Sequence, residues 1–146
     1  MSQENVEMVR GLLPAPDVDI AQLFRDDMLW AALVAAVAPA LRSDFECFNR
    51  GLPGGEGRTY KGLDGLRVLW LDWLAPWATY RTEIEDAIDL GEHVLVPVRD
   101  FARPQESAQE VAFGGAAVWT VRDGKIAQIG FYTSRHEALK AVGLEE

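Results

Sequence analysis

The pattern of apolar positions predicts helices in the first half of the chain. Val6, Val9 and Leu13 recur at helical spacing and should form the buried stripe of a first helix. A second helix should include the apolar run from Met28 to Leu41, which is too short to span a bilayer and is typical of a buried helix. Pro39 should end or kink this helix.

A third helical pattern follows a glycine-rich loop. Residues 49–62 hold five glycines and a proline, which predicts a loop. After it, Leu63, Leu66 and Trp70 lie on one side of a helix that Pro76 closes. These three helices supply the apolar faces against which a sheet can pack.

Strand signals dominate the second half of the chain. Asp44–Phe48 already alternates acidic and apolar residues, as a half-buried strand does. Further along, Gly91-Glu92 and Asp123-Gly124 each separate two strand-like segments, and Asp-Gly is the strongest short hairpin signal in the chain. Two antiparallel hairpins are therefore expected.

The order of these elements predicts an α+β domain. A last helix follows Ser134, with Glu137 three residues later as in a capping box. Helices first and antiparallel strands after them indicate helices on one face of a sheet. We expect residues 1–146 to form one domain, in which a curved antiparallel sheet wraps around three N-terminal helices and leaves a cone-shaped cavity.

Composition and charge narrow the function classes. The net charge is −9, and the chain has no Lys/Arg cluster, so we expect no nucleic-acid partner. Cys47 is the single cysteine, which excludes an intramolecular disulfide, and we expect it to be a small buried hydrophobe rather than a metal ligand. The N-terminus has no signal-peptide pattern, so we expect a cytoplasmic protein without a membrane partner.

Five segments, which cover nearly the whole chain, carry a family resemblance: ENVEMVR, YKGLDGLRVLWLDW, IDLGEHVLVPVR, VWTVRDGKIAQIGFY and SRHEALKAVGL. With these segments in this order, the chain resembles the SnoaL-like branch of the NTF2-like superfamily, which includes polyketide cyclases, ketosteroid isomerases and limonene-epoxide hydrolases. The resemblance implies a cone-shaped, cystatin-like α+β fold and homodimers packed through the outer sheet face. The superfamily hosts enzymes and non-enzymatic binders, so function must be argued from the site.

The Asp123-Gly124 turn also predicts how the last hairpin divides into two faces. It places Arg122 opposite Lys125, and strict alternation then assigns every other residue to the same face. The face expected under the helices, and expected to contact a ligand, holds Val118, Thr120, Ala127, Ile129 and Phe131. The other face, expected to contact a partner subunit, holds Trp119, Val121, Ile126, Gln128 and Tyr132.

The catalytic group is the open question. Cyclases of the family use an aspartate near the end of the last strand as general acid/base, and the corresponding segment here, residues 130–132, has no carboxylate. Asp100 is an alternative base, because an apolar cavity would raise the pKa of its carboxyl group. It can also be a solvated or salt-bridged strand residue, which from its position alone we favour.

Arg99 and Tyr60 are the other candidate catalytic residues. Arg99 can stabilise an anion or a carbonyl, or it can pair with Glu83 or Glu85 across the hairpin, which we favour. As neighbours on a strand, Arg99 and Asp100 should point to opposite faces unless a bulge intervenes. Tyr60 can orient a ligand or cover the core.

Three tryptophans and a histidine complete the candidates. Trp70, Trp73 and Trp77 can line an aromatic pocket for a flat ligand, or they can belong to the core. His93 lies at a turn and is expected at the surface. We find no nucleophile motif, phosphate loop or metal-ligand spacing, and we expect no cofactor and no metal.

Two functions remain open at this point. The first is a homodimer that binds a small hydrophobic or aromatic molecule. As an enzyme, it would catalyse isomerisation, cyclisation or water addition, with Asp100 as base, Tyr60 as orienting donor and Arg99 as stabiliser. The second is a non-catalytic ligand-binding or dimerisation module whose cavity is filled by side chains.

Overall fold

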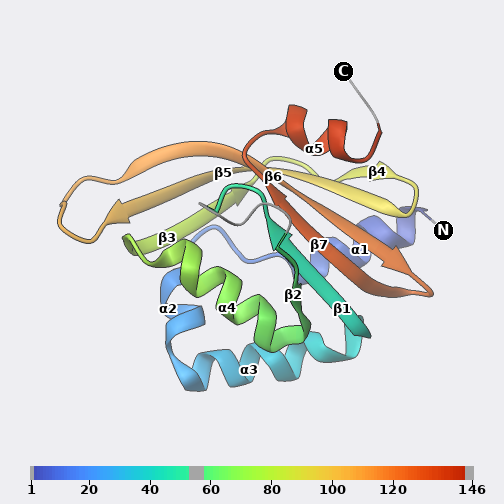
Figure 1. Cartoon of the computed structure of the whole chain (residues 1–146), viewed down its shortest axis with the longest axis horizontal. Helices are drawn as coiled ribbons and strands as arrows, with labels where there is room; N and C mark the ends of the chain where they lie inside the picture. The colour runs from blue at the N-terminus through green and yellow to red at the C-terminus, as the bar shows by residue number, and fades with distance from the viewer. Residues whose placement is uncertain (1, 53–57, 144–146) are drawn as a thin grey trace.

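The computed structural model describes residues 2–52 and 58–143, so the centre of the predicted glycine-rich loop lies outside the described residues (Figure 1). The chain folds into helices that lie mainly on one side of a curved sheet. The elements are α1 (Ser2–Leu12), α2 (Ile20–Arg25), α3 (Asp27–Val37), a short 3-10 helix (Ala38–Ala40), β1 (Leu41–Asn49), β2 (Tyr60–Lys61), α4 (Gly62–Leu74), β3 (Trp77–Ile84), β4 (Ile88–Leu90), β5 (His93–Pro104), β6 (Val111–Arg122), β7 (Lys125–Tyr132) and α5 (Arg135–Ala141).

Two helices, α2 and α3, replace the one that the apolar pattern predicted. Asp19 caps α2, and its carboxylate accepts a hydrogen bond from the Ala21 backbone N–H. Asp26 then ends α2 and caps α3, accepting from the backbone N–H groups of Met28 and Leu29. An aspartate at such a position satisfies donors that a helix start leaves free, so the chain can turn there.

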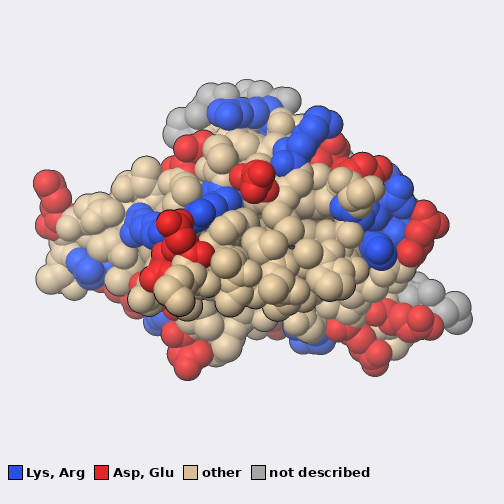
Figure 2. All heavy atoms as spheres, turned by 90° about the horizontal axis from the view of Figure 1, so that it is seen from below, with Lys and Arg blue, Asp and Glu red and all other residues tan. Residues whose placement is uncertain are grey.

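Helix α3 is also less buried than its composition predicts. Trp30 is its one buried residue, whereas Met28 is 84% exposed and Leu29 is 40% exposed. Figure 2, which shows the helical side of the molecule, has a broad central area without charged side chains. The expectation of a buried helix is wrong because α3 packs through one face only. No helix in the described part of the chain is long and apolar enough to cross a membrane.

The sheet is curved and has the strand order β2-β1-β7-β6-β5-β3, with β4 also paired to β5. Helices α2, α3 and α4 lie below the sheet in Figure 1, and α5 lies on the opposite face. The expected α+β class is confirmed. The β1–β7 pair is parallel, so the sheet is mixed rather than entirely antiparallel.

The main core lies between the helices and the inner face of the sheet. Val6 and Val9 of α1 pack there with Leu69 and Val94, as the first apolar stripe predicted. Each fully buried valine or leucine of this kind contributes roughly 1.5–3 kcal/mol of stability. Cys47 is fully buried in the same core, which confirms that it is a small buried hydrophobe, and burial raises the pKa of its thiol to about 12.

The last hairpin has the predicted turn but a different register beyond it. Asp123 and Gly124 both have positive φ, of 55° and 74°, as a two-residue hairpin turn of this type requires. Arg122 pairs with Lys125, as predicted. One pair further on, a β-bulge at Ala127 adds an extra residue to β7, so that Thr120 pairs with Gln128.

The bulge exchanges the faces of β6 relative to the prediction. Trp119 and Val121 pack in the inner core with Ile126, Ile129 and Phe131. Val118 and Thr120, in contrast, line a hollow on the outer face together with Gln128 and Tyr132. The face assignment is therefore confirmed for Ile129, Phe131, Gln128 and Tyr132, and it is wrong for Val118, Thr120, Trp119, Val121 and Ile126.

Candidate functional site

The inner face of the sheet and the helices beneath it enclose a cavity of about 690 Å³. Apolar and aromatic side chains from α2, α3, α4 and the sheet form most of its wall. Such a volume and lining are typical of sites for small organic molecules. The side chains with a nitrogen or oxygen atom among the lining residues are Asn49, Trp70, Trp73, Tyr80, Thr82, Asp100, Trp119, Tyr132 and Thr133.

Asp100 lies in this cavity because of its place in the sheet. It is the register partner of Thr82 on β3 and of Phe113 on β6. Register partners point to the same face of a sheet, so the three side chains form a row across the inner face. Asp19 ties this part of the sheet to α2, because its carboxylate also accepts from the Tyr80 backbone N–H at 3.0 Å.

Two hydroxyl groups hold the Asp100 carboxylate. Thr82 Oγ1 donates to Asp100 Oδ1, and Tyr80 Oη donates to Asp100 Oδ2, both at 2.5 Å. Trp73 of α4 in turn donates its Nε1–H to Tyr80 Oη at 2.9 Å. Thr82 and Tyr80 are buried, so both donors are held in place by packing. The result is a short hydrogen-bonded chain that ends on one carboxylate.

Burial and hydrogen bonding act in opposite directions on the acidity of this group. Burial raises the pKa of the Asp100 carboxyl above its usual value, and the hydrogen bonds from Thr82 and Tyr80 partly oppose that rise. Burial, together with the nearby Asp100 charge, also raises the pKa of Tyr80. Tyr80 therefore stays protonated and acts as a donor, and Asp100 is the proton acceptor of the group.

Aromatic rings surround this polar group. The Phe113 ring centroid lies 6.1 Å from that of Tyr80 and 6.3 Å from that of Trp73. Trp70 packs edge-on against Tyr80 and against Phe131, at 5.8 Å and 5.4 Å. Trp70, Trp73 and Phe131 line the cavity together with Ile129, so four of the predicted ligand-binding residues are brought together.

Arg99 does not join this group. It is exposed on the outer face of the sheet, whereas Asp100 lines the cavity. The two neighbours therefore point to opposite faces, as predicted. Arg99 is the register partner of Glu83, but Glu83 forms its ion pair with Arg81, at 3.2 Å. The Arg99 guanidinium instead lies 5.9 Å from the Phe101 ring centroid. Neither the Arg99–Glu83 nor the Arg99–Glu85 pair, one of which we favoured, is among the ion pairs of the described residues.

Tyr60 and Trp77 lie outside the lining of the cavity. Tyr60 is buried at the β1–β2 edge of the sheet, where its hydroxyl donates to Asp72 at 3.4 Å. Trp77 stacks on Phe113 at 5.8 Å between centroids and supports the aromatic wall from behind. The structure therefore separates both residues from the cavity in which they were expected to act.

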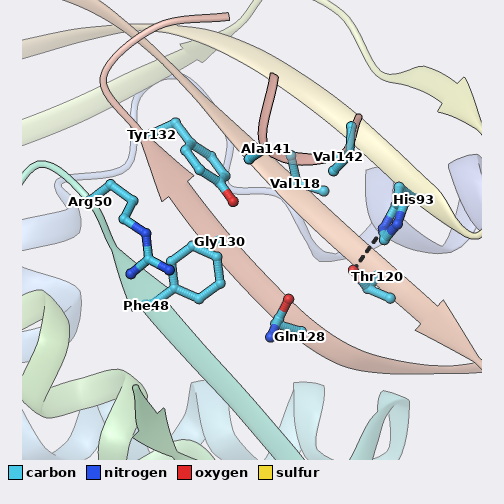
Figure 3. A pocket seen from close by; sticks show the side chains of 10 residues that line it. All are labelled: Phe48, Arg50, His93, Val118, Thr120, Gln128, Gly130, Tyr132, Ala141 and Val142. Carbon is cyan, nitrogen blue, oxygen red and sulfur yellow. Dashed lines mark hydrogen bonds between the residues drawn. The ribbon is translucent and has the colours of Figure 1, made fainter. Parts of the chain in front are cut away.

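A second hollow, of about 470 Å³, lies on the outer face beneath α5 (Figure 3). Val118 and Thr120, which were predicted to contact the inner ligand, line this hollow instead. His93 was expected at the surface, but it is half-buried here, and its Nδ1 lies 2.9 Å from Thr120 Oγ1. Gln128 donates to Glu46 at 3.1 Å. Because Trp119, Val121 and Ile126 point inward, the predicted dimer surface retains only two of its five residues.

The sequence reasoning missed Tyr80, Thr82 and Phe113. The alternation of residues 79–84 does place Tyr80 and Thr82 on one face of a strand. No local signal reveals, however, that this face meets Asp100, because the pairing of β3 with β5 depends on a register set elsewhere. Phe113 has the same relation to Asp100 across β5 and β6.

Comparisons with known proteins agree with this architecture. The family model of the SnoaL-like domain matches residues 17–129. The sequence has no significant match among curated proteins.

Several solved structures are similar over most of the chain. An NTF2-like protein from Burkholderia pseudomallei is 18% identical, with a TM-score of 0.63 over 94% of this chain and 95% of its own. TerC, crystallised with polyporic acid, is 16% identical, with a TM-score of 0.62 over 96% and 98%. A putative SnoaL-like polyketide cyclase from Jannaschia sp. CCS1 is 15% identical, with a TM-score of 0.57 over 99% and 95%. At these identities the likeness shows the fold alone.

Proposed function

Because the chain belongs to the SnoaL-like domain family, we propose that its inner cavity binds a small apolar or aromatic molecule and that Asp100 is the general base of a proton-transfer reaction there. Isomerisation, cyclisation and water addition are the reactions of this kind, and none of them needs a cofactor. The observation that carries the proposal is one carboxylate, held by two hydroxyl donors, in an otherwise apolar and aromatic cavity.

Each neighbouring residue has a role that follows from its contacts. Tyr80 and Thr82 orient the carboxylate and limit the rise of its pKa, and Trp73 orients Tyr80. Trp70 and Phe131 provide flat surfaces against which a ring can pack. Ile129 completes the apolar wall on the side of β7. These residues replace Tyr60 and Arg99, to which the sequence had assigned the supporting roles.

The raised pKa suits a general base. A base is most effective when the pKa of its conjugate acid approaches the working pH, and burial moves the Asp100 carboxyl in that direction. The apolar wall also gives a bound molecule little competing water. Among the similar folds, TerC was crystallised with polyporic acid and another is a putative polyketide cyclase, and both names are compatible with a flat organic ligand.

The proposal can be tested before the natural substrate is known. Nitrobenzisoxazole is a flat, neutral molecule from which a carboxylate can remove a C–H proton; the C–H electrons form a nitrile, and the N–O bond breaks to give a coloured phenolate. We expect the protein to catalyse this elimination with saturation kinetics. Asp100→Asn should lower kcat by at least about 100-fold, the usual size of a general-base contribution.

Glu85→Gln is the matched control. It makes the same acid-to-amide change at an exposed residue that follows β3 and lies outside the lining of the inner cavity, and it should leave the rate unchanged. A rate in Asp100→Asn that equals that of the unmodified protein, with both variants folded by circular dichroism, would exclude Asp100 as the base.

A non-catalytic binding module is the second candidate. Both oxygens of Asp100 already accept a hydroxyl hydrogen bond, which makes the carboxylate less basic, and the strand-end segment lacks the acid of the family's cyclases. Saturable quenching of tryptophan fluorescence by naphthol, without any elimination of nitrobenzisoxazole, would favour this module over the enzyme.

A further inference from the structure

The inner cavity has a single charged side chain in its lining, and its charge is negative. Among the lining residues that the structure describes, Asp100 is the only one, apart from the tyrosines, whose side chain can gain or lose a proton. No lysine, arginine or histidine of the described chain is in that lining. An anion that entered this cavity would lose its hydration and would meet a carboxylate instead of a cation.

The Asp100 carboxylate has room for a further donor. An ionised carboxylate offers about four lone-pair sites, and Thr82 and Tyr80 occupy one on each oxygen. Both of these donors are neutral hydroxyls, so they satisfy hydrogen bonds without balancing the charge. A charged donor would form a stronger hydrogen bond here than a neutral one, and it would also neutralise the carboxylate.

The rings beside Asp100 favour the same type of ligand. Phe113 is the register partner of Asp100, and its ring lies within 6.3 Å of those of Tyr80, Trp73 and Trp77, measured between centroids. The faces of aromatic rings carry negative partial charge, and they attract ammonium groups that lie within about 6 Å. Rings and a carboxylate in one apolar cavity are the usual components of a site for an organic cation.

We propose that the natural ligand of the inner cavity is an organic amine, which binds with its positively charged nitrogen against Asp100 and the rings of Phe113, Tyr80 and Trp73, and with its apolar body along the wall. This inference rests on the proposed function, because it requires that the cavity admits ligands. To that function it adds two specific statements, namely that the ligand is positively charged and that its charge lies at the Asp100 end of the cavity.

Three ligands that share a phenyl body test the inference. Phenethylammonium, phenethyl alcohol and phenylacetate carry a positive, a zero and a negative charge at neutral pH. We expect phenethylammonium to bind about 10-fold tighter than the alcohol, from a charged hydrogen bond and ring contacts, and phenylacetate to bind most weakly. Titration calorimetry and tryptophan quenching both measure these affinities.

Variants separate the local effect from the overall negative charge of the protein. In Asp100→Asn the amine and the alcohol should bind with affinities within about 3-fold of each other, since the charged hydrogen bond is lost. Glu85→Gln should keep the preference for the amine. The preference should also persist at about 0.5 M sodium chloride, where the effect of distant surface charges is screened.

The outcomes distinguish this inference from the function on which it rests. If the alcohol binds as tightly as the amine, or if Asp100→Asn keeps the full preference, the inference is wrong and the proposed binding function stands. If none of the three ligands binds saturably at millimolar concentration, the proposed binding function itself fails, and the inference fails with it.

Discussion

The two hollows of this molecule use opposite faces of the same strands and have opposite chemistry. The inner cavity, of about 690 Å³, contains the carboxylate of Asp100 and no basic side chain among the described residues that line it. The outer hollow, of about 470 Å³, contains Arg50 and His93, and its described lining has no carboxylate (Figure 3). Because side chains alternate along a strand, one sheet can present an acid on one face and bases on the other.

The surroundings of these groups differ more than their charges. Thr82 and Tyr80 are buried and donate to Asp100, and aromatic rings enclose the group. On the outer face, Arg50 is exposed, and its guanidinium lies 4.0 Å from the centroid of the Phe48 ring. The comparison teaches that a reactive group needs burial and fixed donors, and only the inner cavity provides both for an acid.

Filling the inner cavity should have the largest effect on ligand binding, and filling the outer hollow should have none. Val98 lines the inner cavity two residues from Asp100 on the same face of β5, and Val98→Phe should weaken naphthol binding roughly 100-fold, or about 2.7 kcal/mol. Ala141→Phe narrows the outer hollow at an exposed position and should not change naphthol binding. Fluorescence titration measures both, with thermal melting to verify folding. Equal losses in the two variants would show that naphthol does not discriminate between the hollows.

Removing one threonine hydroxyl from each hollow should have an intermediate effect. Thr82→Val deletes a donor that lowers the pKa of Asp100, so this pKa should rise and the acid limb of the elimination rate should move to higher pH. Below the midpoint of that limb the rate should fall about 10-fold, since hydrogen bonds to charged groups are worth about 1.5–3 kcal/mol.

Thr120→Val is the outer-face equivalent. It removes the hydroxyl next to His93 and should leave the pH–rate profile unchanged. A profile for Thr82→Val that coincides with that of Thr120→Val would argue against Thr82 as a residue that positions the base.

The smallest effect should be on stability. The pKa of Asp100 is higher in the folded than in the unfolded chain, so ionisation destabilises the fold as the pH rises through the folded pKa. Asp100→Asn removes this penalty and should stabilise the protein by about 1 kcal/mol at neutral pH, as substitutions of strained functional groups often do. The gain should vanish as the pH falls towards about 3.9, the ordinary aspartate pKa. Urea unfolding at several pH values measures it, and a gain that grows at low pH would contradict the sign.

The sequence predicted the last hairpin correctly where local signals decide the structure. The Asp123-Gly124 turn was predictable because its two residues readily adopt positive φ. The bulge at Ala127 was not predictable, because strict alternation assumes that no strand has an extra residue. That one residue moved Val118 and Thr120 to the outer face and Trp119 to the inner core.

The candidate site was predictable only in its central residue. Asp100 could be selected because it is an acid on a predicted strand in the middle of the sheet, opposite in orientation to Arg99. Its partners could not, because Tyr80, Thr82 and Trp73 reach it through strand register and helix packing. Tyr60 illustrates the same limit, since its position in the sequence gave no sign of its contact with Asp72.

A direct measurement of the Asp100 carboxyl group tests the central claim. Carbon-detected NMR can follow this carboxyl through a pH titration, with and without naphthol, and the exposed Glu85 carboxyl provides a reference for the ligand response. The account predicts an Asp100 pKa above the ordinary value of about 3.9, and a resonance that shifts on naphthol binding while that of Glu85 does not. An Asp100 pKa at or below the ordinary value, with no response to naphthol, would contradict it.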